Sequence, residues 1–262
     1  MDYDRKLSVA IKNNDLESVK RWIKQGANLH ANDDEALRLA ACYGHLEIVK
    51  YLLELGANPH ADDDWAIRFA ARYDHLEVVK YLVEQGADLH ARDNEALRWA
   101  AGNGHLEVIE YLLEQGANLH AADDYALRLA AENGHLEVVK CLLEQGANLH
   151  ADDDHALRRA ARKSHLEIVK YLLEQGADSN LITEQMLVKL FTSYDLEIAK
   201  NTPLLTSLLL KMDLVKKPYQ IRTRNKTIST YRKRILSSLD ILMYHLYYSP
   251  SGPGFFQAIK RI

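Results

Sequence analysis

Residues 121–150 read AADDYALRLAAENGHLEVVKCLLEQGANLH, and this stretch decides the fold because nearly the same thirty residues return along most of the chain. Its triplet His-Leu-Glu recurs once per period, beginning at His45, His75, His105, His135 and His165. A fixed period of roughly 20 to 50 residues indicates a solenoid, in which each unit buries its apolar face against its neighbours. This architecture favours an extended binding surface over a catalytic pocket.

Two helices are predicted within each unit. Good helix formers fill residues 125–131, and Asp123 or Asp124 stands before them as an N-cap. After the break at 133–134, apolar residues return at helical spacing, at Leu136, Val139, Leu142 and Leu143. Gly146 follows where a left-handed helix end is expected, because glycine adopts that conformation without steric cost. Each unit is therefore expected to fold as helix, turn, helix and short connector.

This unit resembles the ankyrin repeat. Residues 133–151 are similar to the second-helix half of the ankyrin consensus, and residues 126–131 are similar to its first-helix half. The resemblance implies an all-α solenoid over 1–200, with a degenerate unit at 1–30, five regular units over 31–180 and a degenerate closing unit at 181–200. A basic C-terminal tail with a helical capping segment is expected over 201–262.

The chain departs from the family pattern in two respects. Its period is three residues shorter than the usual ~33, and the Thr-Pro-Leu-His tetrapeptide that opens the first helix is missing. We therefore expect tight turns in place of the hairpins that project between ankyrin repeats. In this shortening the chain resembles ankyrin proteins of mimivirus-type giant DNA viruses, which implies a viral protein that acts in a host cell.

An intracellular location, foremost the cytoplasm, is expected. The polar opening at 1–15 has no apolar signal-peptide core, and Cys42 and Cys141 form no pairing framework. No cofactor or metal is expected, because each histidine column supplies one imidazole per repeat whereas zinc needs several converging ligands. The Asp-rich connectors lack a calcium-binding loop, and no catalytic motif is present. An enzyme is therefore not expected.

Residues that differ between the copies are the better candidates for function, since the shared residues record duplication and packing. In the ankyrin family, first helices and connectors form a concave binding face, and the differences lie there. The candidate partner-binding residues are Trp65, Arg72, Tyr73, Tyr125, Tyr43, His155 and Arg162. Two interpretations are open: an aromatic and basic patch of the kind that supplies interface hot spots, and drift after duplication. Phe69 and Trp99 occupy a position that packs between repeats, so we expect them in the core.

Charge is distributed unevenly along the chain. Residues 201–262 hold eleven of the 33 Lys/Arg and two of the 37 Asp/Glu, which leaves 22 basic and 35 acidic residues, or −13, in the first 200. The run 216–234 holds eight basic residues and no acid. It is suited to nucleic acid or an acidic membrane surface, and equally to lying against the acidic solenoid or staying disordered.

The sequence therefore predicts a monomeric, non-enzymatic module that binds a protein partner through its concave face. A binder of nucleic acid or membrane through the tail, and a duplicated repeat protein with little selected activity, are the alternatives.

Overall fold

The computed structural model describes residues 3–183 and Met186, and over these residues it contains twelve α-helices, one short 3-10 helix and no strand. Contacts divide the chain into two compact units, Met1–Ala156 and Leu157–Ile262. The predicted all-α solenoid of helix-turn-helix units is confirmed. No helix in the described part combines the length and the apolar character that crossing a membrane requires.

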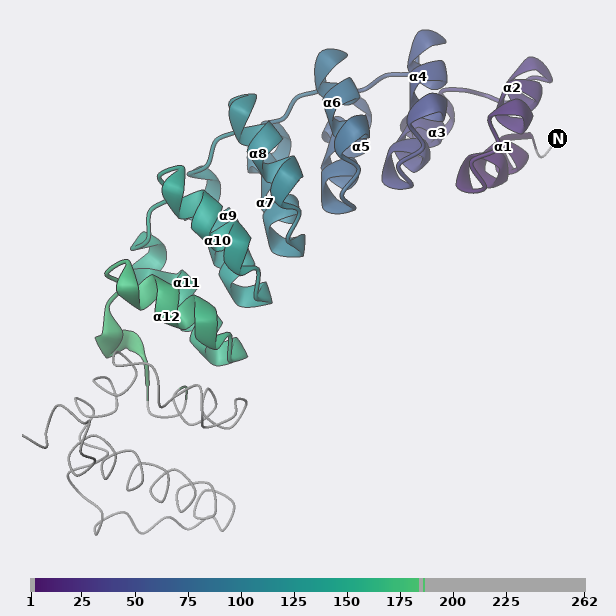
Figure 1. Cartoon of the computed structure of the whole chain (residues 1–262). Helices are drawn as coiled ribbons and strands as arrows, with labels where there is room; N and C mark the ends of the chain where they lie inside the picture. The colour runs from purple at the N-terminus through teal and green to yellow at the C-terminus, as the bar shows by residue number, and fades with distance from the viewer. Residues whose placement is uncertain (1–2, 184–185, 187–262) are drawn as a thin grey trace, which may run out of the picture. The chain divides into compact units, whose positions relative to one another are not determined.

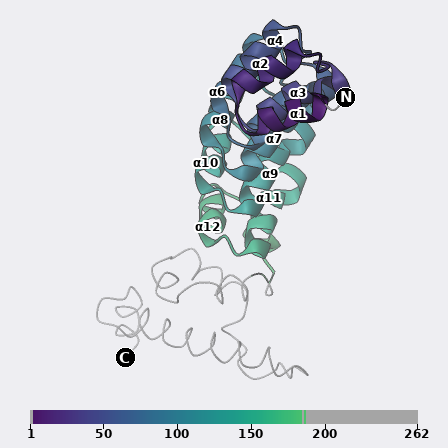
Figure 2. The ribbon, with the colours of Figure 1, turned by 90° about the vertical axis from the view of Figure 1, so that its right-hand side faces the viewer.

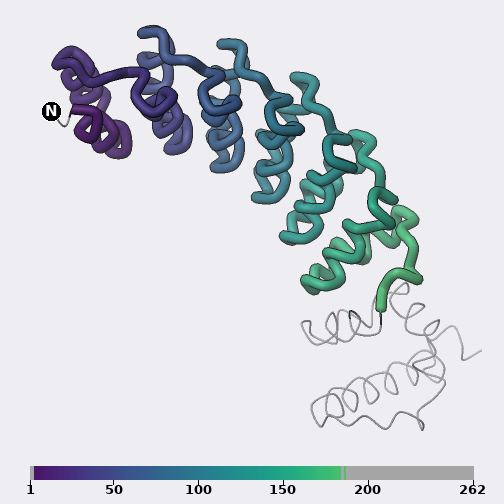
Figure 3. The backbone as a smooth tube through the Cα atoms, turned by 180° about the vertical axis from the view of Figure 1, so that it is seen from behind, coloured from purple at the N-terminus to yellow at the C-terminus, as the bar shows by residue number. Residues whose placement is uncertain are grey.

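Five complete helix pairs make up the first unit. They are α1 (Tyr3–Lys12) with α2 (Leu16–Lys24), α3 (Ala31–Cys42) with α4 (Leu46–Glu54), α5 (Ala61–Arg72) with α6 (Leu76–Glu84), α7 (Ala91–Asn103) with α8 (Leu106–Glu114), and α9 (Ala121–Asn133) with α10 (Leu136–Glu144). The pairs stand in a curved row, with the connectors between pairs along its outer edge (Figures 1 and 3). Residues 3–24 thus form a helix pair like the regular ones.

The helices of this row form two layers. In Figure 2 the odd-numbered helices lie on one side and the even-numbered helices on the other. Successive odd-numbered helices contact one another far more extensively than successive even-numbered helices do. Small alanines such as Ala100 and Ala101, both fully buried, permit this close approach. The odd-numbered helices, which we call the first-helix layer, therefore form one continuous surface.

The core lies between the two layers. In α10 it is built from the buried Val138, Val139 and Leu142, whereas Leu136 and Leu143 of the predicted stripe are only half-buried. The predicted left-handed helix end at Gly146 is confirmed by its φ of +98°. Burial of each large aliphatic side chain contributes roughly 1.5–3 kcal/mol, so the second helices supply most of the hydrophobic stabilisation.

The connectors differ from the predicted capped helix starts. Residues 122–124 have φ of 51°, 55° and 54°, a left-handed turn that precedes the right-handed part of α9. The same turn occupies residues 32–34, 62–64, 92–94 and 152–154. Asp and Asn tolerate this conformation because their short polar side chains form local hydrogen bonds. The aspartates of the connectors therefore stabilise the left-handed turn. The N-cap role predicted for Asp123 or Asp124 is wrong.

The second unit begins within α11 (Ala151–Lys163) and continues with α12 (Leu166–Glu174) and η1 (Ser179–Leu181). In α12 the buried residues are Leu166, Ile168, Val169, Leu172 and Leu173. Most of the predicted closing unit at 181–200, and all of the capping segment and basic tail in 201–262, lie outside the described residues.

Candidate functional site

Four aromatic side chains gather on the first-helix layer, at α5 and α7. Trp65 and Phe69 lie four residues apart in α5, and Tyr73 follows four residues later as the C-cap, so the three lie along one helix face. The ring centroids of Trp65 and Phe69 are 3.5 Å apart in a stacked arrangement, and that of Tyr73 lies 6.1 Å from Phe69. Trp99 of α7 meets Phe69 edge to face at 4.9 Å. We call these four residues the aromatic cluster.

Arginine side chains surround the aromatic cluster. The guanidinium of Arg72 lies 4.9 Å from the Trp99 ring centroid, and that of Arg38 lies 5.5 Å from the Trp65 centroid. Contacts of this kind contribute roughly 0.5–2 kcal/mol each. The structure therefore brings together three of the predicted residues, namely Trp65, Arg72 and Tyr73.

The cluster is only partly covered by the protein. Tyr73 is 46% exposed, and Trp65, Phe69 and Trp99 are half-buried. The predicted contact of Phe69 and Trp99 between repeats is confirmed, but their predicted place in the core is wrong. Both rings belong to a partly exposed face of the first-helix layer, and the four-residue spacing from Trp65 to Tyr73 was the signal for it.

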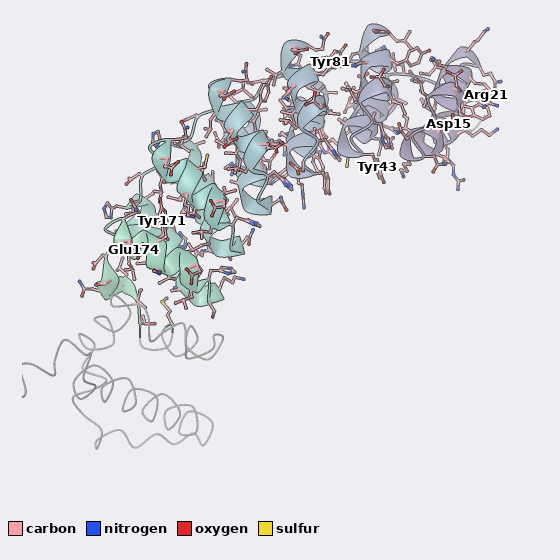
Figure 4. The ribbon with its side chains drawn as sticks, in the orientation of Figure 1. Asp15, Arg21, Tyr43, Tyr81, Tyr171 and Glu174 are labelled. Atoms are coloured by element: carbon pink, nitrogen blue, oxygen red, sulfur yellow. The ribbon has the colours of Figure 1, made fainter. Side chains whose placement is uncertain are left out.

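The other candidate residues make different contacts. Tyr125 lies between two guanidinium groups, with Arg128 at 4.8 Å and Arg98 at 5.6 Å from its ring centroid. Tyr43 is 46% exposed and stacks on His45 at 5.9 Å, at the end of its pair where α3 turns into α4 (Figure 4).

Two candidates lie near the boundary between the units. His155 pairs with Asp152, at 2.6 Å between Nδ1 and Oδ2, and its Nδ1 is 3.2 Å from Nη1 of Arg128. It therefore belongs to a polar network at the start of α11. Arg162 lies in the last turn of α11, within the second unit.

A column of arginines at equivalent positions of successive repeats, which includes Arg38 and Arg68, stabilises the left-handed turns of the first-helix layer by hydrogen bonds. Arg38 donates to the carbonyl of Asn32 in its own turn and to the carboxylate of Asp62 in the next, at 2.8 and 2.7 Å. Arg68, only 2% exposed, donates to the carbonyl of Asp62 and pairs with Glu95. The turns and the aromatic side chains beside them are thus held in fixed positions.

Buried acceptors tie each connector to the next. Oδ1 of Asp124 accepts the backbone N–H of Asn148 at 2.9 Å, and Oδ1 of Asn94 accepts that of Asn118 at 2.7 Å. Equivalent bonds join Asp34 to Asn58 and Asp64 to Asp88. This column of hydrogen bonds, which we call the connector ladder, runs through the regular repeats of the first unit.

Both histidine columns take part in the stacking of repeats. Nε2 of His135 is 3.1 Å from the carbonyl of Gly102, and His75 and His105 make the same contact with the preceding repeat. His120 of the other column contacts Asp124 through Nδ1 at 3.0 Å. Nowhere in the described part do three potential metal ligands converge.

Burial shifts two titratable groups beside this layer. It lowers the pKa of His45, and the backbone carbonyl of Lys12 opposes that shift. It raises the pKa of the Cys42 thiol, and the nearby positive charge of Arg72 opposes that shift. A thiol with a raised pKa is a poor nucleophile at neutral pH, so Cys42 is not an activated cysteine.

Comparison with protein families gives one result. The family model described as Ankyrin repeats (3 copies) matches residues 7–93, 66–123 and 97–183, which together span more than half of the chain. No curated protein shows a significant sequence match to the chain.

Proposed function

Because this chain belongs to the ankyrin-repeat family, whose repeats generally bind other proteins, we propose that it is a non-enzymatic module that binds a protein partner through its first-helix layer. The observation that carries the proposal is the aromatic cluster, which places Trp65 and Tyr73 beside arginines on a partly exposed face. Aromatic residues and arginine dominate the binding energy of protein interfaces.

The rigidity of this face supports the same proposal. The connector ladder and the arginine column fix the turns from which the first helices begin. A surface that is already ordered loses little conformational entropy when a partner binds, so more of the contact energy appears as affinity. The family is typically non-enzymatic.

The proposal is tested by co-purification with the full-length chain from cells. Trp65→Ala combined with Tyr73→Ala should abolish capture of the partner. Tyr81→Ala in the opposite layer is the matched control, because it removes a tyrosine from the same repeat (Figure 4). Equal capture by the cluster variant and the wild type would overturn the proposal.

The location, the assembly state and the origin of the partner are further parts of the proposal. We propose that the protein acts in the cytoplasm as a monomer, and its free cysteines, Cys42 and Cys141, fit a reducing compartment. The resemblance to repeats of giant DNA viruses points to a host protein as the partner. Proximity labelling of host cells that express the full chain tests the location and the origin of the partner, since it reports the compartment and the neighbouring proteins together. The elution volume of the purified full chain in size-exclusion chromatography with light scattering tests the monomeric state.

The basic run 216–234 favours a second candidate function, the binding of nucleic acid or of an acidic membrane surface. A full-length variant with its eight basic residues changed to Gln separates the two functions. Loss of capture in that variant, with a steep fall in wild-type binding as salt rises, would favour the tail. Capture that persists without those charges would favour the first-helix layer. If deletion of the gene has no effect on the fitness of the organism that carries it, the result would favour a duplicated repeat protein with little selected activity.

A further inference from the structure

The pairing of the arginine column with acidic residues is interrupted at Arg98, the residue next to Trp99. Arg128 bonds an aspartate 24 residues later, at 2.7 Å between Nη1 and Oδ2 of Asp152, just as Arg38 bonds Asp62. The residue 24 positions after Arg98 is Ala122, which has no carboxylate. Within the described part Arg98 donates only to the carbonyl of Arg92, at 2.7 Å, and lies over the Tyr125 ring. Its positive charge therefore has no acidic partner there.

Arg72 is a second arginine without an acidic partner in the described residues. Its guanidinium lies over three rings, at 4.9 Å from the centroid of Trp99, 5.6 Å from Tyr73 and 5.7 Å from Phe69. These contacts use the faces of the rings and leave the planar N–H fork for another acceptor. The fork matches a carboxylate in a bidentate arrangement.

We propose that the aromatic cluster, together with Arg72 and Arg98, binds an acidic peptide segment of the protein partner. One carboxylate of the segment pairs with Arg72, a second pairs with Arg98, and an apolar side chain covers the rings of Trp65 and Trp99. This inference rests on the proposed function, because it specifies the partner of the same first-helix layer. Covering the rings excludes water from the Arg72 pair, and this strengthens its electrostatic attraction.

The charge of the chain favours a peptide over a nucleic acid on this surface. The first 200 residues carry −13, so the positive charge on the first-helix layer is local. A nucleic acid brings one negative charge per nucleotide along its whole backbone. Most of those charges would face the acidic body of the protein, whereas a segment with two carboxylates is matched by two arginines.

The test is a selection of random displayed peptides on the immobilised full-length chain, followed by binding titrations of the enriched peptides in solution. Peptides enriched by the wild type should combine Asp or Glu with Leu, Phe or Trp. Arg72→Gln should weaken their binding by roughly tenfold, as loss of a charge-assisted pair does. Arg98→Gln should weaken peptide binding to a similar extent. It also provides an independent test if the Arg72→Gln variant does not fold.

Arg92→Gln is the matched control. Arg92 lies on the same repeat as Arg98, but it is half-exposed and is paired with Asp63. It should change peptide binding by less than about twofold, since exposed pairs contribute little. Charge reversal by Arg72→Glu should shift the enriched peptides from acidic to basic composition.

Two results would overturn the inference and leave the proposed function intact. The first is enrichment of peptides without acids whose binding still falls with Trp65→Ala and Tyr73→Ala. The second is equal binding of acidic peptides to the Arg72→Gln and wild-type chains. Tighter binding of a fluorescent oligothymidine that depends on Arg72 would overturn the inference in favour of nucleic acid. No enrichment over blank beads would count against the inference and the proposed function together.

Discussion

Asp124 links two connectors through a side chain that is only 6% exposed. Its Oδ1 accepts the N–H of Asn148 and contacts Nδ1 of His120. In the preceding repeat Asn94 makes the same two contacts with a neutral amide oxygen. The connector ladder therefore requires a buried acceptor at this position, and it does not require a negative charge.

This comparison predicts opposite outcomes for two substitutions of Asp124. Asp124→Asn should change the free energy of unfolding by less than about 0.5 kcal/mol, the scatter of substitutions that keep every interaction. Asp124→Ala should lower it by roughly 0.5–1.5 kcal/mol, because the hydrogen bond from the N–H of Asn148 is lost. Urea denaturation of the three proteins measures the difference. An equal loss in both variants would show that the charge itself is needed.

His45 predicts a dependence of stability on pH. Burial lowers its pKa in the folded protein, so the unfolded chain binds the proton more readily. The contribution of neutral His45 to the free energy of unfolding is therefore fully present above the ordinary pKa of about 6.5. It is lost as the pH falls from there toward the lowered pKa of His45 in the folded protein. His45→Gln should lose less stability than the wild type between about pH 8 and about pH 5. The other eleven histidines are common to both proteins, so parallel pH profiles would contradict the prediction.

At the level of elements, the sequence predicted the helix pairs but not the handedness of the connectors. Period and apolar spacing located α9 and α10, because those patterns follow from helix geometry alone. Asp and Asn are favoured both as N-caps and in left-handed turns, so Asp123 and Asp124 fit either structure. Ala122 adopts the same turn with φ +51°. The bonds to neighbouring repeats therefore decide the conformation, and they are not visible in local sequence.

Alanine substitutions at two glycines with nearly equal φ are expected to lower the free energy of unfolding by unequal amounts. Gly104 has φ +85°, and a Cβ there would lie 2.6 Å from Nδ1 of His135. Gly116 has φ +90° and no atom within 4 Å of the same point. Gly116→Ala should cost about 1–2 kcal/mol from backbone strain alone.

Gly104→Ala should cost more than Gly116→Ala, because the imidazole of His135 must also leave its contact with the Gly102 carbonyl. Thermal unfolding of the two variants measures the difference. His135→Ala should remove the excess cost of Gly104→Ala in a double-mutant cycle. Equal midpoints for the two glycine variants would exclude the collision.

At the scale of the whole molecule, the period predicted the repeated architecture, and the candidate site was predicted only in part. Trp65, Arg72 and Tyr73 were expected together and lie together. Phe69 and Trp99 were assigned to the core because apolar residues in that column face the next repeat. In a solenoid such residues are covered by their neighbours along the row but not by the second layer. Apolar character and contact with another repeat therefore do not imply complete burial.

The row of helix pairs predicts that a defect spreads little along the first unit. Its extensive contacts join helices of the same pair or of adjacent pairs. Leu37 is fully buried in α3, and Leu37→Ala should cost about 2–5 kcal/mol. Hydrogen exchange followed by mass spectrometry should show faster exchange in α1 to α6 and little change in α9 and α10. A uniform increase over all ten helices would mean that the row opens as one body.

The connector ladder has a consequence for how the gene can change in length. Each bond joins a residue to its partner 24 positions later in the chain, and the His135 type of contact reaches 33 positions back. Both spacings repeat with the thirty-residue period, so gaining or losing thirty codons restores every bond at the new junction. Recombination between misaligned copies of the repeat can therefore lengthen or shorten the coding sequence in whole units without leaving a buried acceptor of the connector ladder unbonded.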